Sequence, residues 1–222
     1  LGIAGLVGAG RTEMAELICG SKKIEKGTIE INGKTVKIHS PSDAIKNGIG
    51  LIPEDRKKDG CIIHNSVLFN TTLLCDKDYM KFGIISSRKR KAIAEKYKEA
   101  LRIKVPTIQQ SVGNLSGGNQ QKVIVAKTMA ADMDIVFFDE PTKGIDVGAK
   151  YEIYQLMNDM TAAGKSIIMI SSDMEEILGV SDRIIVLYEG QVGGEITKDK
   201  FTQENILTLA SGLKLDEEEV AS

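Results

Sequence analysis

The sequence predicts an α/β fold with a mostly parallel sheet core, a small antiparallel β part and an inserted α-helical subdomain. Apolar strand-like runs alternate with helical segments in the C-terminal half, which is the order typical of parallel sheets covered by helices. Residues 135–138 (IVFF) form a continuous apolar run, as expected of a parallel strand buried on both faces. Between residues 60 and 113 the strand-like runs give way to polar helical periodicity, which indicates the insertion.

Each expected element follows from the period of its apolar residues and from the residues that end it. Strands are expected at residues 1–5, 28–31, 36–38, 49–52, 135–138, 166–170, 183–187 and 191–195. Helices are expected at residues 12–19, 41–45, 87–101, 120–129, 150–160, 174–178 and 203–210. Gly20 ends the first helix, and Asn32-Gly33 supplies the turn of a hairpin between two short strands.

Length and composition limit the classes of protein to which the chain can belong. With 222 residues, of which 42% are hydrophobic, it can bury a sizeable core in one domain. A net charge of −2 argues against a protein that coats nucleic acid, and the basic run at 88–91 is expected to be a solvated helix face. Cys19, Cys61 and Cys75 fit no metal-binding spacing and are expected to be reduced thiols. No apolar run is long enough to cross a bilayer, so a role at a membrane requires a partner.

The segment GLVGAGRT near the N-terminus matches the phosphate-binding pattern G-x-x-x-x-G-K-[ST] except that Arg11 replaces the lysine. In such a loop between strand and helix, backbone N–H groups point at phosphates and the helix dipole adds positive charge. Gly5, Gly8 and Gly10 permit the tight turns, and the Thr12 hydroxyl can bind Mg²⁺. Arginine keeps the charge, but its longer, forked group differs in geometry from lysine. The alternative is a glycine-rich turn that only packs.

Asp139 and Glu140 directly follow the apolar run, at the expected end of a buried strand. Open parallel sheets bind ligands at the carboxyl ends of their strands. Asp139 is therefore expected to meet the Mg²⁺ of a nucleotide held by Thr12, and Glu140 to orient or deprotonate an attacking water. An exposed acidic loop is the alternative, but a buried strand directly before the pair makes it the weaker interpretation.

The signature segment, residues 115–119 (LSGGN), opens a helix with a second potential anion site. The Ser116 hydroxyl and the N–H groups of the first turn can both face an anion. This segment and the phosphate loop fall in different expected subdomains, so a single chain does not easily bring them together. Asp146 follows the acidic pair and is expected at the same seam. In isolation, a plain serine-glycine helix cap would be the simpler interpretation.

Together these motifs resemble the nucleotide-binding cassette of ABC transporters across essentially the whole chain. They occur in the family's order: phosphate loop, glutamine-type loop, signature, Asp-Glu pair, Asp-containing loop and switch residue. The stretches GLVGAGRTE, PEDRKKDG, LSGGNQQK and DVGAKYEIYQLM resemble more narrowly the second, C-terminal cassette of bacterial monosaccharide importers. Those importers serve ribose, xylose, galactose or autoinducer-type sugars.

The resemblance implies a P-loop NTPase cassette that binds ATP and Mg²⁺. It further implies that a first cassette precedes this one in the same polypeptide, and that the two associate head to tail with ATP between them. Transmembrane permease subunits are the implied direct partners, a periplasmic or lipoprotein sugar receptor is an indirect one, and no nucleic acid is involved. The implied location is the cytoplasmic face of the cell membrane, through the permease.

The same resemblance divides the single domain, residues 1–222, into an α/β core, a helical subdomain and a tail. The core is expected at about 1–59 and 131–212, the helical subdomain at about 60–130, and an acidic, disordered tail at 213–222.

The family pattern also assigns roles to individual residues. The residues implied to bind nucleotide at the chain's own site are Gly5, Gly8, Ala9, Gly10, Arg11, Thr12 and Glu13. Those implied to complete the site of the partner cassette, or to lie at the seam, are Ser116, Gly117, Gly118, Asn119 and Asp146. The implied Mg²⁺ ligands are Thr12, Asp139 and Glu54, and the implied catalytic residues are Glu140, Ser172 and Glu54.

Three departures from the general cassette weaken the chain's own site. Arg11 replaces the lysine of the phosphate loop, Glu54 replaces a glutamine that senses Mg²⁺, and Ser172 replaces a histidine that contacts the γ-phosphate. Each change removes or distorts an interaction expected to strengthen in the transition state. One such loss typically costs about 10²–10³ in rate, although losses need not add. The expected function is a sugar-import cassette that hydrolyses ATP weakly at its own loop and lends its signature to an active partner site.

Two other functions remain open from the sequence. One is a regulatory or docking cassette that does not hydrolyse ATP and no longer binds nucleotide at its own loop. The other is a soluble ABC protein acting on nucleic acid or ribosomes. The short insertion, which has no sustained heptads, makes the latter the weakest of the three.

Overall fold

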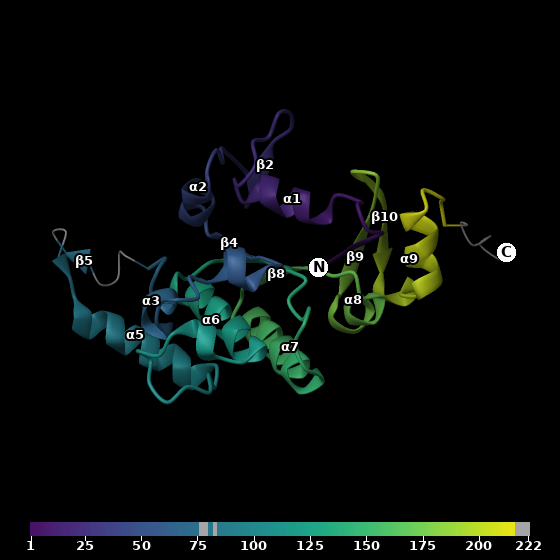
Figure 1. Cartoon of the computed structure of the whole chain (residues 1–222). Helices are drawn as coiled ribbons and strands as arrows, with labels where there is room; N and C mark the ends of the chain where they lie inside the picture. The colour runs from purple at the N-terminus through teal and green to yellow at the C-terminus, as the bar shows by residue number, and fades with distance from the viewer. Residues whose placement is uncertain (76–79, 82–83, 216–222) are drawn as a thin grey trace. The chain divides into compact units, whose positions relative to one another are not determined.

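The computed structural model describes residues 1–75, 80–81 and 84–215, and these fall into two compact units (Figure 1). The first unit comprises residues 1–43 and 168–222, and the second comprises residues 44–167. The acidic run at 216–219, expected to be a disordered tail, lies outside the described residues.

The first unit is built on a sheet in which β1 pairs in parallel with β8 on one side and β9 on the other. Its strands are β1 (Gly2–Gly5), β2 (Ile29–Ile31), β3 (Lys34–Val36), β9 (Arg183–Tyr188) and β10 (Gln191–Thr197), together with the larger part of β8 (Ser166–Ile170), which begins in the second unit. Its helices are α1 (Arg11–Ile18), α8 (Met174–Val180), α9 (Gln203–Ala210) and the 3₁₀ turn η3 (Lys198–Lys200), while α2 (Pro41–Lys46) crosses the boundary between units.

Two hairpins give the first unit its antiparallel pairing. β10 pairs with β9 across a two-residue turn at Glu189 and Gly190, whose φ angles are 46° and 76°. Positive φ at both positions is the geometry that matches the right-handed twist of strands joined by a two-residue turn. The β2–β3 hairpin turns at Asn32 and Gly33, as the sequence predicts, again with positive φ at both positions.

The second unit combines a parallel strand pair with most of the helices. Its strands are β4 (Ile49–Ile52), β5 (Met80–Lys81), β6 (Ile84–Ile85) and β7 (Ile135–Asp139). Its helices are the π-helix η1 (Arg56–Gly60), α3 (Val67–Thr71), α5 (Ser87–Ala100), the 3₁₀ turn η2 (Val112–Asn114), α6 (Gly117–Ala130) and α7 (Val147–Ala162). β4 and β7 run parallel, and Phe137 and Phe138 are fully buried, which confirms the interpretation of the IVFF run.

Helix α6 is the core element of the second unit. It packs against α3 and α5 on the helical side and against β4 and η1 on the strand side. Because neighbours surround it, most of its residues are buried, including Gln120, Gln121 and Lys122. Buried polar side chains are normally hydrogen-bonded, so the hydrogen-bond partners of these three residues are informative.

The parallel pairing of β1, β4, β7, β8 and β9 with interspersed helices confirms the predicted fold class.

A helix begins earlier than predicted where the residue that caps it lies upstream of the apolar pattern. The helix expected at 150–160 begins at Val147, because the Asp146 carboxylate caps it by accepting from the Ala149 N–H. The π-helix η1 was not predicted; the Asp55 carboxylate caps it through the N–H groups of Lys57 and Lys58. The expected division into core, helical subdomain and tail stays a prediction.

Burial affects the chemistry of the three cysteines. Cys19, Cys61 and Cys75 are buried free thiols, and burial raises the pKa of Cys19 to about 12 and that of Cys61 to about 11. Among the helices of the described residues, none combines the length and apolar character that crossing a membrane requires.

Asn70 in α3 fixes the loop that follows η1. The side chain is 1% exposed, and its Oδ1 accepts from the Ile62 N–H at 2.8 Å. Its Nδ2 donates to the carbonyls of Ile62 and Ser66 at 3.0 and 3.1 Å. One side-chain amide thus provides hydrogen bonds to main-chain groups that have no partner within regular secondary structure.

We expect Asn70→Ala to lower the free energy of unfolding by about 3 kcal/mol, because it leaves several main-chain groups near the core without their partner. Urea denaturation followed by circular dichroism measures this change. Asn47→Ala, in the α2–β4 turn, is the control for loss of an asparagine elsewhere. Equal stability of Asn70→Ala and the wild type would contradict this role for Asn70.

Candidate nucleotide site and signature segment

The phosphate loop lies between β1 and α1 in the first unit, and its glycines are required by its conformation. Gly8 and Gly10 have φ of 83° and 92°, the left-handed region that glycine occupies without strain. At Gly5, with φ of 153°, a Cβ atom would lie 2.6 Å from the Leu187 carbonyl oxygen, so a side chain cannot fit. The loop is also held from the side, since the Gly190 N–H donates to the Ala9 carbonyl at 3.1 Å. These features fit the predicted phosphate cradle.

Arg11, at the start of α1, is bound to the main chain of its own unit. Its Nη1 donates to the carbonyl oxygens of Gly5 and Ser171, both at 2.8 Å. The guanidinium therefore connects the beginning of the loop to the segment that follows β8. Thr12 and Glu13 follow in the first turn of α1, whose N–H groups have no intrahelical acceptor.

Ser172 is exposed and lies between β8 and α8, next to the residue whose carbonyl binds Arg11. Ser171 is buried; its hydroxyl donates to the Glu176 carboxylate and accepts from the Asp173 N–H, both at 3.0 Å. The Asp173 carboxylate in turn caps α8. Two of the three departures, Arg11 and Ser172, thus occupy one connected part of the first unit.

The acidic residues of the second unit surround one lysine. Asp139 is the last residue of β7 and is 2% exposed. Glu54 forms a 2.5 Å ion pair with Lys143. The hydrogen bond and charge of Glu54 raise the pKa of Lys143, and the charges of Glu140 and Asp139 raise it further. Lys143 therefore offsets negative charge where three carboxylates gather.

Glu140 has a left-handed backbone, with φ of 46°. This conformation costs a non-glycine residue about 1–2 kcal/mol. Strained backbone at an acidic residue directly after a buried strand is typical of functional sites, where the surrounding structure enforces a side-chain position.

Arg56, from η1, joins these acids to the signature segment. Its Nη1 donates to the Lys143 carbonyl at 2.7 Å and its Nη2 to the Gly144 carbonyl at 3.3 Å. A Cβ atom on Gly117 would lie 3.5 Å from Arg56 Nη2. Burial lowers the pKa of Arg56. The sequence alone assigns no role to this arginine, which lies within the stretch PEDRKKDG.

The signature segment packs directly on the start of α7. A Cβ atom on Gly118 would lie only 2.7 Å from the Ala149 Cβ, so glycine is required for this approach. The Ser116 hydroxyl accepts from Asn119 Nδ2 at 2.9 Å, and Asn119 Oδ1 accepts from the Lys104 N–H at 2.7 Å. Asn119 thereby orients the serine, a contact that the motif alone does not reveal.

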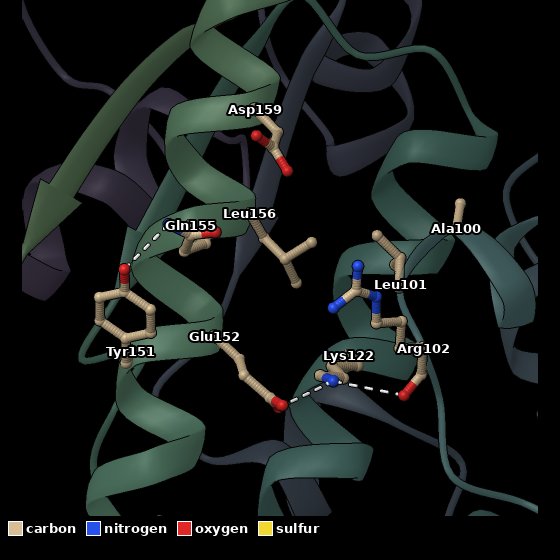
Figure 2. Close-up of a pocket in the computed structure, with 9 residues that line it drawn as sticks. All are labelled: Ala100, Leu101, Arg102, Lys122, Tyr151, Glu152, Gln155, Leu156 and Asp159. Atoms are coloured by element: carbon tan, nitrogen blue, oxygen red, sulfur yellow. Dashed lines mark hydrogen bonds and ion pairs between the residues drawn. The ribbon is translucent and has the colours of Figure 1, made fainter.

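Two pockets adjoin this segment within the second unit. One, of about 290 Å³, is lined by Lys104, Ser116, Gly118, Asn119, Lys122, Asp146, Gly148, Ala149 and Glu152. The other, of about 350 Å³, has the apolar residues Leu101 and Leu156 between charged walls (Figure 2). Lys122 and Glu152 line both pockets and form a 2.8 Å ion pair, while Lys122 Nζ also lies 3.3 Å from the Arg102 carbonyl (Figure 2).

The predicted site residues thus fall into two groups. The second unit contains the acids Glu54, Asp139 and Glu140, the signature segment and Asp146, and connects them through Lys143 and Arg56. The first unit contains the phosphate loop and Ser172. The roles assigned to individual residues, including the Mg²⁺ ligands Thr12, Asp139 and Glu54, stay predictions.

Comparison with known proteins identifies relatives over nearly the whole chain. The model of the ABC transporter family matches residues 1–143. A ribose import ATP-binding protein of Lactococcus lactis subsp. lactis is 49% identical over 212 residues, covering 96% of this chain and 43% of the relative. A xylose import ATP-binding protein of Thermoanaerobacter pseudethanolicus is 51% identical over 215 residues, with coverage of 96% and 43%. The chain therefore spans less than half the length of these relatives.

Solved structures share the fold at lower identity. The dimeric structure of a post-hydrolysis state of an ATP-binding cassette bound to ADP and Pi has a TM-score of 0.74 at 24% identity, covering 89% of this chain and 84% of that one. A nucleotide-free ATP-binding cassette from an ABC transporter has a TM-score of 0.76 at 20% identity, covering 95% and 83%. Both comparisons confirm the predicted cassette fold.

Glu140→Gly is expected to raise the free energy of unfolding by about 1 kcal/mol, because glycine adopts φ of 46° without the strain that glutamate bears there. Thermal and urea unfolding measure the change. Glu189→Gly is the matched control, since Glu189 also has φ of 46° but lies in a hairpin turn, and a similar gain is expected. Glu140→Ala removes the same carboxylate and keeps the strain. If it stabilises the chain as much as glycine does, the charge rather than the backbone is responsible.

Proposed function

Because this chain belongs to the ABC transporter family, we propose that it is an ATP-binding cassette that powers the import of a monosaccharide. The observation that carries this proposal is the likeness, at about half of all positions and over 96% of the chain, to ribose and xylose import ATP-binding proteins. The structure supports it by placing Gly5, Gly8 and Gly10 of the phosphate loop and Gly118 of the signature segment at positions that favour glycine.

We place the chain as the second of two cassettes in one polypeptide. The stretches that resemble the C-terminal cassette support this placement, as does the length of the relatives, which is more than twice the stretch matched. In this arrangement the first cassette of the same polypeptide is the immediate partner. Transmembrane permease subunits hold both cassettes at the cytoplasmic face of the membrane and connect them indirectly to a sugar receptor.

The phosphate loop provides the chain's own nucleotide site. Left-handed glycines turn its backbone, and the start of α1, like other helix N-termini, suits an anion. The Thr12 hydroxyl and the carboxylates of Asp139 and Glu54 are the proposed Mg²⁺ ligands, and Glu140 the base that positions water. Bound Mg²⁺ supplies positive charge between the phosphates.

This site is proposed to hydrolyse ATP weakly, and three side chains carry the argument. The Arg11 guanidinium is bound to two carbonyls, whereas a phosphate-binding lysine would direct its charge at the nucleotide. Glu54 is paired with Lys143 and brings a negative charge where the general cassette has a neutral amide. Ser172 can offer a hydrogen bond but no positive charge.

The signature segment is proposed to serve the nucleotide of the partner cassette. Its serine is the N-cap of α6, its glycines have no side chains to block an approaching phosphate, and Asn119 holds the hydroxyl. Arg56 places a cation beside Gly117. The arrangement provides donors and positive charge for an anion while requiring no contribution from the chain's own phosphate loop.

We propose testing the difference between the weak nucleotide site of this chain and its signature segment in the complete two-cassette subunit assembled with its permease. We expect Ser116→Arg to abolish sugar transport, because the bulky cation occupies the place of the partner's phosphate. Glu140→Gln should lower the ATPase rate less than tenfold, because it alters a site that is already weak. ATPase activity and transport in proteoliposomes measure both changes. Equal loss of ATPase activity in the two variants would reject the asymmetry.

Arg11→Lys is expected to tighten the binding of ATP to the chain's own loop by about tenfold, because the lysine ammonium is a compact charge on a flexible stem that can turn toward phosphate, whereas Nη1 of the planar guanidinium is bound to two carbonyls. Titration with a fluorescent ATP analogue and Mg²⁺ measures the change, and Thr12→Ala is the control that should weaken binding.

The main-chain bonds of Arg11 also favour a second function, a docking cassette whose own loop no longer takes nucleotide. Saturable binding to the wild-type chain that Thr12→Ala abolishes would exclude this alternative. Binding in neither the wild type nor Arg11→Lys would favour it over an ATP-binding site.

A further inference from the structure

Gln120 and Gln121 are neighbours in α6, both buried, yet their amides differ in environment. Gln120 is 6% exposed, and its Nε2 donates to the Val112 carbonyl at 3.2 Å. Gln121 is 1% exposed, and in the part of the chain that the structure describes neither its Nε2 nor its Oε1 has a hydrogen-bond partner. Leaving both ends of a buried amide unsatisfied is costly, and such groups are rare in folded proteins.

The helical period places Gln121 on the face of α6 that meets residues 144–145 and η1. Gly117, one turn earlier, lies against Gly144 and Ile145, and Ile124, one turn later, lies against Gly60. Residues at i, i+4 and i+7 share one side of a helix, so Gln121 occupies the middle of this contact.

The direction of its side chain narrows the possible partners. Helical side chains lean toward the N-terminus and cover the preceding turn, which here is Gly117. Because Gly117 has no side chain, the space over it is available to the Gln121 amide. The main chain beside that space is residues 144–145, since a Cβ atom on Gly117 would lie 3.4 Å from the Gly144 carbonyl oxygen and 3.4 Å from Ile145 Cγ2. Arg56 Nη2 lies beside the same space, 3.5 Å from a Cβ atom on Gly117, and the Arg56 guanidinium binds the carbonyls of Lys143 and Gly144.

We propose that Gln121 is a positioning residue for the signature segment: its amide gains hydrogen bonds to the backbone of residues 143–145 when the cassette takes its ATP-bound arrangement. In the arrangement described here the amide is unsatisfied, so this state carries a penalty that the ATP-bound state lacks. The difference favours the arrangement in which the first turn of α6 and the residues after the Asp-Glu pair are held together. This role rests on the function proposed above, because it concerns the signature that serves the partner's nucleotide.

The chain supplies a matched pair of variants. Gln121→Leu and Gln121→Met remove the unsatisfied amide and keep the volume, so without nucleotide each should favour the folded state by about tenfold in the unfolding equilibrium. Gln120→Leu removes a satisfied amide and leaves the Val112 carbonyl without its donor, so it should have the opposite effect. Urea unfolding of the 222-residue chain measures all three.

A second measurement, of ATP hydrolysis by the complete transporter, distinguishes a positioning role of Gln121 from an effect on stability alone. In the complete transporter, Gln121→Leu and Gln121→Met are expected to lower kcat for ATP about tenfold with little change in KM, although both stabilise the nucleotide-free chain. A purely structural role predicts the gain in stability with an unchanged kcat.

Three results would overturn the proposal. If Gln121→Leu and Gln121→Met destabilise the chain as Gln120→Leu does, the amide is already satisfied, for instance by a buried water. If they stabilise the chain but retain the wild-type kcat, the amide has no part in the ATP-bound arrangement. A wild-type transporter that does not hydrolyse ATP would instead reject the function proposed above, and the positioning role with it.

Discussion

The close approach of α6 to the start of α7 is the constraint on which the second unit depends. Gly118 lies so near Ala149 that a single additional carbon would collide with it, and Gly117 brings the same helix within reach of Arg56 and residues 144–145. Because the helix start sits there, Ser116, Asn119 and Asp146 gather around one pocket. The Lys122–Glu152 ion pair and the Arg56 hydrogen bonds further stabilise this close approach, which is possible because Gly117 and Gly118 have no side chains.

Much of the fold could be predicted from the sequence, because the spacing of apolar residues and the presence of turn residues determine local structure. The Asn32-Gly33 turn and the left-handed Gly8 and Gly10 favour their backbone geometry locally, and the apolar IVFF run indicates a buried strand without knowledge of its partner. Helix starts were less predictable, since the Asp146 cap depends on one side chain upstream of the apolar pattern. The π-helix η1 is harder to predict, because the buried Gly60 at its end packs against Ile124 of α6, a tertiary contact that the local Asp55 cap does not reveal.

The candidate site was predictable as a set of motifs but not as a set of contacts. Sequence spacing identifies Glu54, Asp139 and Glu140 as candidates, yet it does not indicate that Lys143 pairs with Glu54 or that Arg56 reaches the carbonyls of Lys143 and Gly144. The contrast between Gln120 and Gln121 is invisible in the sequence, where they are identical letters. In the same way, Arg11 and Ser172 are separate departures in the sequence, but in the structure Arg11 binds the carbonyl of the residue before Ser172.

The hydrogen bond from the Gly190 N–H to the Ala9 carbonyl has a consequence for how the chain can tolerate change. Exposed two-residue turns are ordinarily the places where a protein accepts insertions, grafted tags and variation between relatives. The β9–β10 turn looks like such a place, but it buttresses the phosphate loop, and a Cβ atom on Gly10 would lie 3.4 Å from the Gly190 Cα. The position of this turn is therefore tied to the loop it supports, and an engineer seeking a permissive surface position should look elsewhere.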